Sequence, residues 1–179
     1  ALSTALSSPQ FLYRQETGIS VSDIRAGNTA ATLPTQMIDN DAFVLTSYEL
    51  ASFLAFTFTG STPDNELLEA AKNGVLATDI LIEAQTNRLL NKSSARAHFG
   101  KFAEHWLATE NVSNGTALSG IEFTDAVDRS LPRELTEVFN HVVLDQAAPF
   151  TTLFSSNYSI INETLFNFYN LGSVYVNND

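Results

Sequence analysis

Three histidines are the side chains in this sequence best suited to bind a metal or to move a proton near neutral pH. His98 and His105 are seven residues apart, which is about 10.5 Å along a helix axis. Two histidine ligands on one helix normally stand four residues apart, so this spacing does not predict a shared ion. We expect both side chains to border an apolar helix face and to hydrogen-bond to backbone or water.

The third histidine, His141, follows Glu137 by four residues on a predicted helix. This spacing predicts an ordinary surface pair that stabilises the helix by a few tenths of a kcal/mol. A general base is the alternative, because histidine titrates near neutrality. No Ser, Asp or Glu motif around His141 marks it as one.

Two further segments could bind a cation or a haem iron. Asp39-Asn40-Asp41 resembles the start of a calcium loop, but Val44 and Leu50 stand where an EF-hand needs Gly and Glu. We therefore expect a solvated turn before a helix, with a weak, irregular cation site as the alternative. Met37, the one methionine, lacks a nearby Cys-x-x-Cys-His motif, so packing or exposure is expected rather than haem ligation.

The remaining chemical signals point away from catalysis. The chain has no Cys, which excludes disulfides, thiolate zinc sites, iron–sulfur clusters and covalently attached c-type haem. There is no Gly-rich phosphate loop and no Gly-x-Ser-x-Gly motif. The sequence thus assigns no catalytic, cofactor-binding or metal-binding residue, and we expect no cofactor in this chain.

Charge excludes two classes of partner. The formal net charge is −11, with nine basic residues and no basic cluster, which argues against nucleic acid and against anionic membrane surfaces. No apolar run approaches the roughly 20 residues that span a bilayer, so we expect no membrane span.

Helix signals follow one another along most of the chain. Thr46 and Glu49 form a predicted capping box, Gly60 ends that helix, and Pro63 suits the first turn of the next. Gly74 fits a left-handed helix end, Thr78 and Asp79 begin another helix, and Ser93 or Ser94 begins the next. By contrast, Thr17 to Asp41 has little periodicity and predicts a long surface connector.

Two later stretches have clear helical periodicity. The first places Phe99, Phe102, Ala103, Trp106 and Leu107 on one stripe, so Trp106 is expected to be buried. The second runs from Leu135 to Val143, with Pro132 near its start. Shorter helical segments are predicted over 149–154 and 162–169. Strand alternation is nearly absent, so the expected fold class is all-α, an irregular helical bundle of about six to eight helices.

Several of these motifs together resemble a bacterial family, the domain of unknown function numbered 1592. The stretch Leu6–Arg14 looks like the end of the short companion domain that precedes it. The resemblance divides the chain into residues 1–44, an N-terminal helix and connector, and residues 45–179, a helical domain. The Phe56-Thr57-Phe58 segment departs from the family, which more often has Trp after Leu. The matching stretches are Leu45–Leu54, Gly60–Leu68, Ala71–Leu76, Phe102–Leu107, Arg133–Thr136, Asn162–Leu165 and Tyr169–Leu171.

The resemblance implies where the protein acts and what surrounds it, but it implies no reaction and no catalytic residues. Members of this family sit among companion domains in large exported proteins that often carry a c-type cytochrome module. It therefore implies a periplasmic or extracellular, non-catalytic module that contacts companion domains or chains. The alternative is a component of an oxidoreductase whose haem is supplied by a partner domain. The residues expected at such an interface are the aromatic side chains near the end of the chain, Phe154, Tyr158, Phe166, Phe168 and Tyr169. The alternative is that this C-terminal segment folds back and fills the core.

Overall fold

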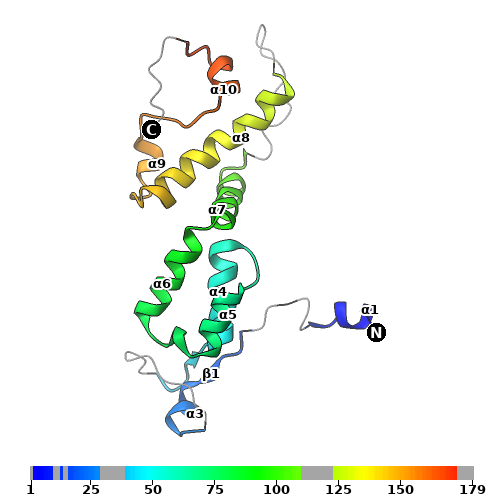
Figure 1. The fold of residues 1–179 in the computed structure, drawn as a ribbon, viewed down its shortest axis with the longest axis vertical. Helices are drawn as coiled ribbons and strands as arrows, with labels where there is room; N and C mark the ends of the chain where they lie inside the picture. The colour runs from blue at the N-terminus through cyan, green and yellow to red at the C-terminus, as the bar shows by residue number, and fades with distance from the viewer. Residues whose placement is uncertain (1, 10–12, 14–15, 29–38, 110–122, 173–179) are drawn as a thin grey trace. The chain divides into compact units, whose positions relative to one another are not determined.

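A computed structural model describes residues 2–9, 13, 16–28, 39–109 and 123–172. The chain divides into two compact units, Ala1–Asn91 (unit 1) and Lys92–Asp179 (unit 2), which we treat separately. Helices dominate both units, and the one described sheet has two short strands (Figure 1). The predicted all-α fold with about six to eight helices is confirmed. The elements of unit 1 are α1 (Leu2–Leu6), β1 (Ile19–Ser20), α3 (Val21–Arg25), β2 (Phe43–Val44), α4 (Ser47–Thr59), α5 (Asn65–Lys72), the 3-10 helix η1 (Val75–Ala77) and α6 (Asp79–Leu90).

In its described part, residues 17–28 and 39–41, the predicted connector contains a short strand and a short helix that the sequence did not predict. Antiparallel strands β1 and β2 pair Ile19 with Val44. Helix α3 follows at once, capped by Ser20, whose hydroxyl accepts a hydrogen bond from the Asp23 amide. These elements have two to five residues, too few for hydrophobic periodicity to reveal them.

Helices α4, α5 and α6 enclose the core of unit 1. Gly60 ends α4 with a φ of 64°, and Gly74 follows α5 with a φ of 67°, as the sequence predicts. Helix α5 begins at Asn65, two residues after Pro63, because Asp64 rather than the residues before Pro63 caps it. The buried side chains of this core include Leu54, Leu67, Leu76 and Leu89.

The predicted capping box at the start of α4 is present and reaches beyond its own helix. The Thr46 amide donates to Glu49 Oε2 at 2.8 Å, and the Glu49 amide donates to the Thr46 hydroxyl at 3.2 Å. Glu49 Oε1 accepts from the amides of Thr17 and Gly18 at 2.8 and 3.0 Å. Burial of the carboxyl opposes ionisation, but these donors prevail and lower the pKa of Glu49 to about 2.

We expect this carboxylate to make the stability of unit 1 pH-dependent. Because the folded pKa lies below the ordinary value, its contribution is complete above about pH 4.5 and is lost as the pH falls toward about 2. Glu49→Ala should cost about 1–2 kcal/mol at pH 7, and the difference from wild type should shrink toward zero at pH 2. Urea unfolding followed by circular dichroism measures this. A difference in unfolding free energy between Glu49→Ala and wild type that stays constant with pH would contradict the expectation.

Unit 2 is built around the pair α7 and α8. Its elements are α7 (Ser93–Trp106), α8 (Asp125–Asn140), the π-helix η3 (His141–Asp145), α9 (Thr152–Ser155) and α10 (Glu163–Phe168). Helix α8 begins at Asp125, and Pro132 lies inside it. The helix starts this early because the Thr124 hydroxyl accepts a hydrogen bond from the Val127 amide and so caps its N-terminus. The expectation that Pro132 stands near the helix start was therefore wrong.

Small residues let α7 and α8 approach closely. Ala95, Gly100 and Ala103 form the buried face of α7. A Cβ atom placed on Gly100 would lie 2.5 Å from Thr136 Cγ2 on α8. Phe139 on α8, whose ring contacts that of Phe102 on α7, and Val142 on η3 are almost completely buried.

Candidate functional site

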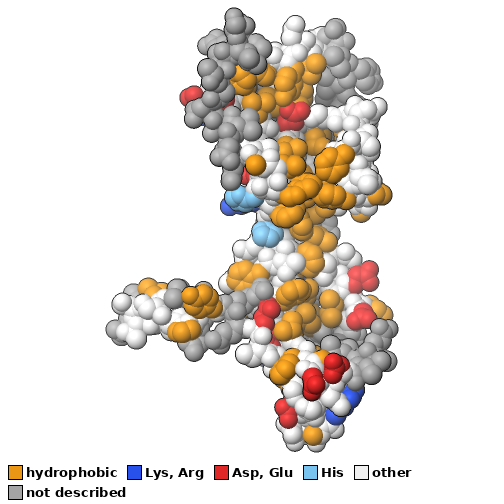
Figure 2. Space-filling model, turned by 180° about the vertical axis from the view of Figure 1, so that it is seen from behind, with side chains coloured by type: hydrophobic (Ala, Val, Ile, Leu, Met, Phe, Trp, Pro, Cys, Tyr) orange, Lys and Arg blue, Asp and Glu red, His pale blue; other side chains and the backbone are white. Residues whose placement is uncertain are grey.

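Four exposed aromatic rings of unit 2 contact one another, and we call them the aromatic surface: Phe102, Trp106, Phe150 and Phe154. Phe102 and Trp106 are four residues apart on α7 and lie parallel, with ring centroids 6.3 Å apart. Phe150 lies 5.2 Å from Trp106, and Phe154 of α9 lies 6.2 Å from it. Trp106 is therefore the centre of the surface. Figure 2 shows hydrophobic side chains exposed together on unit 2.

The chain after α8 brings two of these rings back to α7. It turns at Ala147, whose φ of 46° lies in the left-handed region. Phe150 then packs on the buried ring of Phe139, with centroids 6.5 Å apart, and Phe102 contacts the same ring at 6.0 Å. Phe139 thus supports the surface from beneath.

The exposure of this surface corrects the prediction that Trp106 is buried. Trp106 is 44% exposed, Phe102 52%, Phe150 49% and Phe154 71%. The periodic stripe on α7 is real, but the face that packs on α8 runs through Ala95, Gly100 and Ala103. Close approach on these small residues leaves Phe102 and Trp106 at the border of the core.

The five aromatic residues predicted at an interface fall into different ring clusters among the described contacts. Phe154 belongs to the aromatic surface. Tyr158 is exposed, its ring lies 5.8 Å from that of His141, and its hydroxyl donates to Gln146 at 3.2 Å. On α10, Phe168 contacts Tyr169, and both Phe166 and Phe168 are half-buried. Their role at an interface stays a prediction.

Phe102, Trp106 and Phe150 were not among the predicted interface residues. The first two lie on a stripe that the sequence assigns to the core, and Phe150 contacts Trp106 across more than forty positions of sequence. One available signal was the set of small residues on α7, because a helix that packs through Ala and Gly can leave its larger neighbours uncovered.

The histidines are placed as ordinary helix residues. His98 is half-buried with its ring 6.0 Å from Phe99, and His105 is exposed. His141 does not pair with Glu137. Its Nδ1 lies 3.5 Å from Asp145 Oδ2, and its Nε2 lies 2.9 Å from Gln146 Nε2. Within the described ranges, no three His, Asp or Glu side chains gather closely enough to hold a metal ion.

Glu137 instead joins an ion-pair network on Arg96. The guanidinium of Arg96 lies 2.5 Å from Asp145 and 3.4 Å from Glu137. The hydrogen bond to Asp145 raises the pKa of Arg96, with Glu137 contributing in the same direction against the opposing effect of burial. The network ties α7 to the end of α8 and to η3.

Asp39 and Asp41, the acidic residues of the calcium-loop-like segment, lie at a turn. The Asp41 amide donates to Asp39 Oδ1 at 2.9 Å, which is the solvated turn that the sequence predicts. Met37 lies outside the described residues.

Comparison with known proteins gives a family over most of the chain. Residues 45–171 match the family described as "PSD4: Protein of unknown function (DUF1592)". No curated protein and no solved structure matches the chain. In the described part of the chain, no helix is both long and apolar enough to cross a membrane.

Proposed function

The chain belongs to the DUF1592 family of proteins of unknown function, and we propose that it acts by docking to other protein domains through the aromatic surface of unit 2. Large apolar rings that remain in contact with water are costly unless a partner covers them. Trp and Phe are also enriched where protein interfaces bury their central residues.

The observation that carries this proposal is the position of Trp106. It is the one Trp of the chain, it is 44% exposed, and it contacts three other rings of the surface. A rigid indole surrounded by further rings is typical of a residue that dominates the energy of an interface. A partner that covers these rings would gain apolar burial with little loss of side-chain entropy.

The resemblance of the sequence supports a more specific version of this proposal. The partners would be companion domains of a large exported bacterial protein, in the periplasm or outside the cell, and one of them would carry a c-type cytochrome. This chain would position those domains. If the assembly is an oxidoreductase, the partner supplies the haem, because this chain has no Cys to attach one.

The natural fluorescence of Trp106 tests the proposal directly. Companion domains encoded with this chain are purified singly and titrated into it, and burial of the indole should shift its emission to the blue. Phe150→Ala/Phe154→Ala should weaken the binding at least about thirtyfold, which corresponds to about 2 kcal/mol for interface-centre residues. Tyr48→Ala, at an exposed aromatic position of unit 1, is the control and should bind as wild type does.

Two results would overturn the proposal. One is a chain that stays monomeric in light scattering and whose Trp106 emission responds to none of its companion domains. The other is a double variant that binds as tightly as the wild type.

A further inference from the structure

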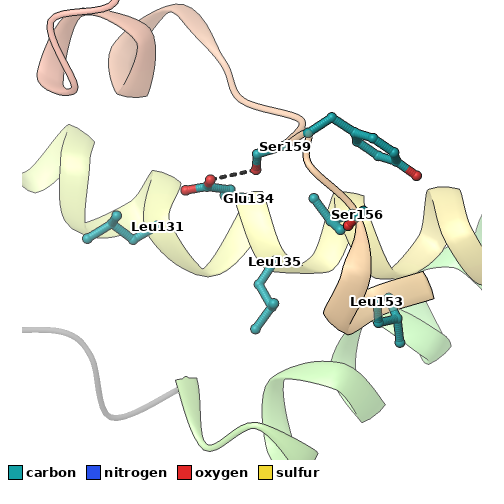
Figure 3. Close-up of a pocket in the computed structure, with 8 residues that line it drawn as sticks. Leu131, Glu134, Leu135, Leu153, Ser156 and Ser159 are labelled. Atoms are coloured by element: carbon teal, nitrogen blue, oxygen red, sulfur yellow. Dashed lines mark hydrogen bonds between the residues drawn. The ribbon is translucent and has the colours of Figure 1, made fainter. Parts of the chain in front are cut away.

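A pocket of about 340 Å³ lies beside α8, on a different set of residues from the aromatic surface. This volume is at the lower end of the range for small-molecule sites, about 300–1,000 Å³. Figure 3 shows Leu131 and Leu135 on α8, Leu153 on α9, and Glu134 with Ser156 and Ser159 around the same space. The lining thus combines aliphatic side chains with one carboxylate and several hydroxyl groups.

Helix geometry places the carboxylate at the edge of an apolar stripe. At about 100° per residue, Leu131, Leu135 and Val138 share one face of α8, and Glu134 borders it. All four side chains are half-buried. A ligand lying along this face would meet aliphatic carbon along its length and the carboxylate at one side.

Glu134 is held in place by two hydroxyl groups from later in the chain. Ser159 Oγ donates to Glu134 Oε1 at 2.6 Å, and Tyr169 Oη donates to Glu134 Oε2 at 2.6 Å. Burial, followed by the hydrogen bond to Glu134 and its charge, raises the pKa of Tyr169 to about 12, so this hydroxyl stays protonated. A carboxylate offers about four lone-pair positions, and two remain for a ligand.

The charge around this pocket favours a cation. Among the described residues that line it, Glu134 is the one charged side chain. The sequence after Arg133 has no Lys or Arg, and Glu137 and Asp145 already pair with Arg96, which leaves Glu134 as the carboxylate of this pocket. Arg133 lines a neighbouring hollow, where Glu134 and Glu137 supply two carboxylates against its one positive charge. A ligand with a positive end would therefore be attracted and an anion repelled.

We propose that this pocket binds an unbranched aliphatic chain that ends in a primary ammonium group, with the ammonium on Glu134 and the chain along Leu131, Leu135, Val138 and Leu153. The ammonium has three N–H donors and no acceptor, which suits a carboxylate with nearby serine oxygens that can accept. A free alkylamine and the side chain of a partner's lysine present this same chemistry. The site does not depend on docking at the aromatic surface.

Titration of the full chain with n-pentylamine at pH 7, followed by NMR, tests the proposal. n-Pentanol is the neutral probe of the same length, and short peptides with Lys or norleucine at the centre test the second source. We expect pentylamine to bind at least about tenfold more tightly than pentanol, because a hydrogen bond to a charged group is stronger than a neutral one. Glu134→Gln, which preserves shape and removes the charge, should weaken pentylamine at least about tenfold.

Glu163→Gln removes one charge from an exposed position of the same unit and should leave pentylamine binding unchanged. Preferential binding of the Lys peptide over the norleucine peptide, lost in Glu134→Gln, would support the site with a polypeptide as the source. Equal affinities for pentylamine and pentanol would overturn the proposal. So would equal losses of pentylamine affinity in Glu134→Gln and Glu163→Gln. Failure of both the amine and the Lys peptide to bind would also overturn it.

Discussion

Gly100→Val is expected to destabilise unit 2 by about 2–3 kcal/mol. A Cβ atom at this position would lie 2.5 Å from Thr136 Cγ2, far inside van der Waals contact, and valine adds two methyl groups. Inserting atoms into a packed helix interface typically costs 1–3 kcal/mol. Trp106 stands on the same helix and is the one Trp of the chain, so its fluorescence in a urea titration reports this unit.

Two variants separate packing from helix propensity. Ala97→Val changes an exposed position of α7 and should cost only about 0.5 kcal/mol. Thr136→Ser removes the clashing methyl group but keeps the hydroxyl that donates to the Pro132 carbonyl at 3.0 Å. Combined with Gly100→Ala, a variant that adds only the clashing Cβ atom, Thr136→Ser should therefore restore much of the stability that Gly100→Ala loses. Equal losses of unfolding free energy in Gly100→Val and Ala97→Val would show that the close approach of α7 and α8 contributes little to stability.

Asp64→Ala is expected to destabilise unit 1 by about 2–3 kcal/mol, because one carboxylate makes two kinds of contact. Asp64 Oδ1 caps α5 by accepting the Leu67 amide at 2.8 Å. The same carboxylate accepts two hydrogen bonds from Arg88 on α6, at 2.7 and 3.0 Å. Loss of a cap costs about 1 kcal/mol, and a hydrogen bond to a charged group contributes about 1.5–3 kcal/mol before allowance for partial exposure.

Two further variants separate the stability that comes from capping α5 from the stability that comes from the interaction with Arg88. Asp64→Asn keeps an oxygen for the cap but loses the charge, so it should cost about half as much as Asp64→Ala. Glu66 lies 3.1 Å from Arg88 but is 62% exposed, and Glu66→Ala should cost no more than about 0.5 kcal/mol. Urea unfolding by circular dichroism and hydrogen exchange of the α5 and α6 amides measure the effects. Similar small losses in Asp64→Ala and Glu66→Ala would refute the structural role assigned to Asp64.

Local sequence determined the helices of this protein and several of their ends. The capping box of Thr46 and Glu49 and the left-handed glycines at 60 and 74 each depend on contacts within about four residues. Such contacts can be read from spacing alone. Helix α6 also begins after Thr78 as predicted, although the Thr78 side chain makes no capping hydrogen bond. The same reasoning failed for α3, whose five residues are too few to show a period.

Tertiary structure alone decided which aromatic rings are covered. A periodic stripe predicts which face of α7 is apolar, but it does not say how wide the contact with α8 is. Because α7 packs through Ala95, Gly100 and Ala103, Trp106 lies outside the buried face and remains partly exposed. The aromatic surface and the Glu134 pocket both join residues distant in sequence, such as Trp106 with Phe150 and Glu134 with Tyr169. Only the return of the chain after α8 brings these partners together, and no local pattern encodes that return.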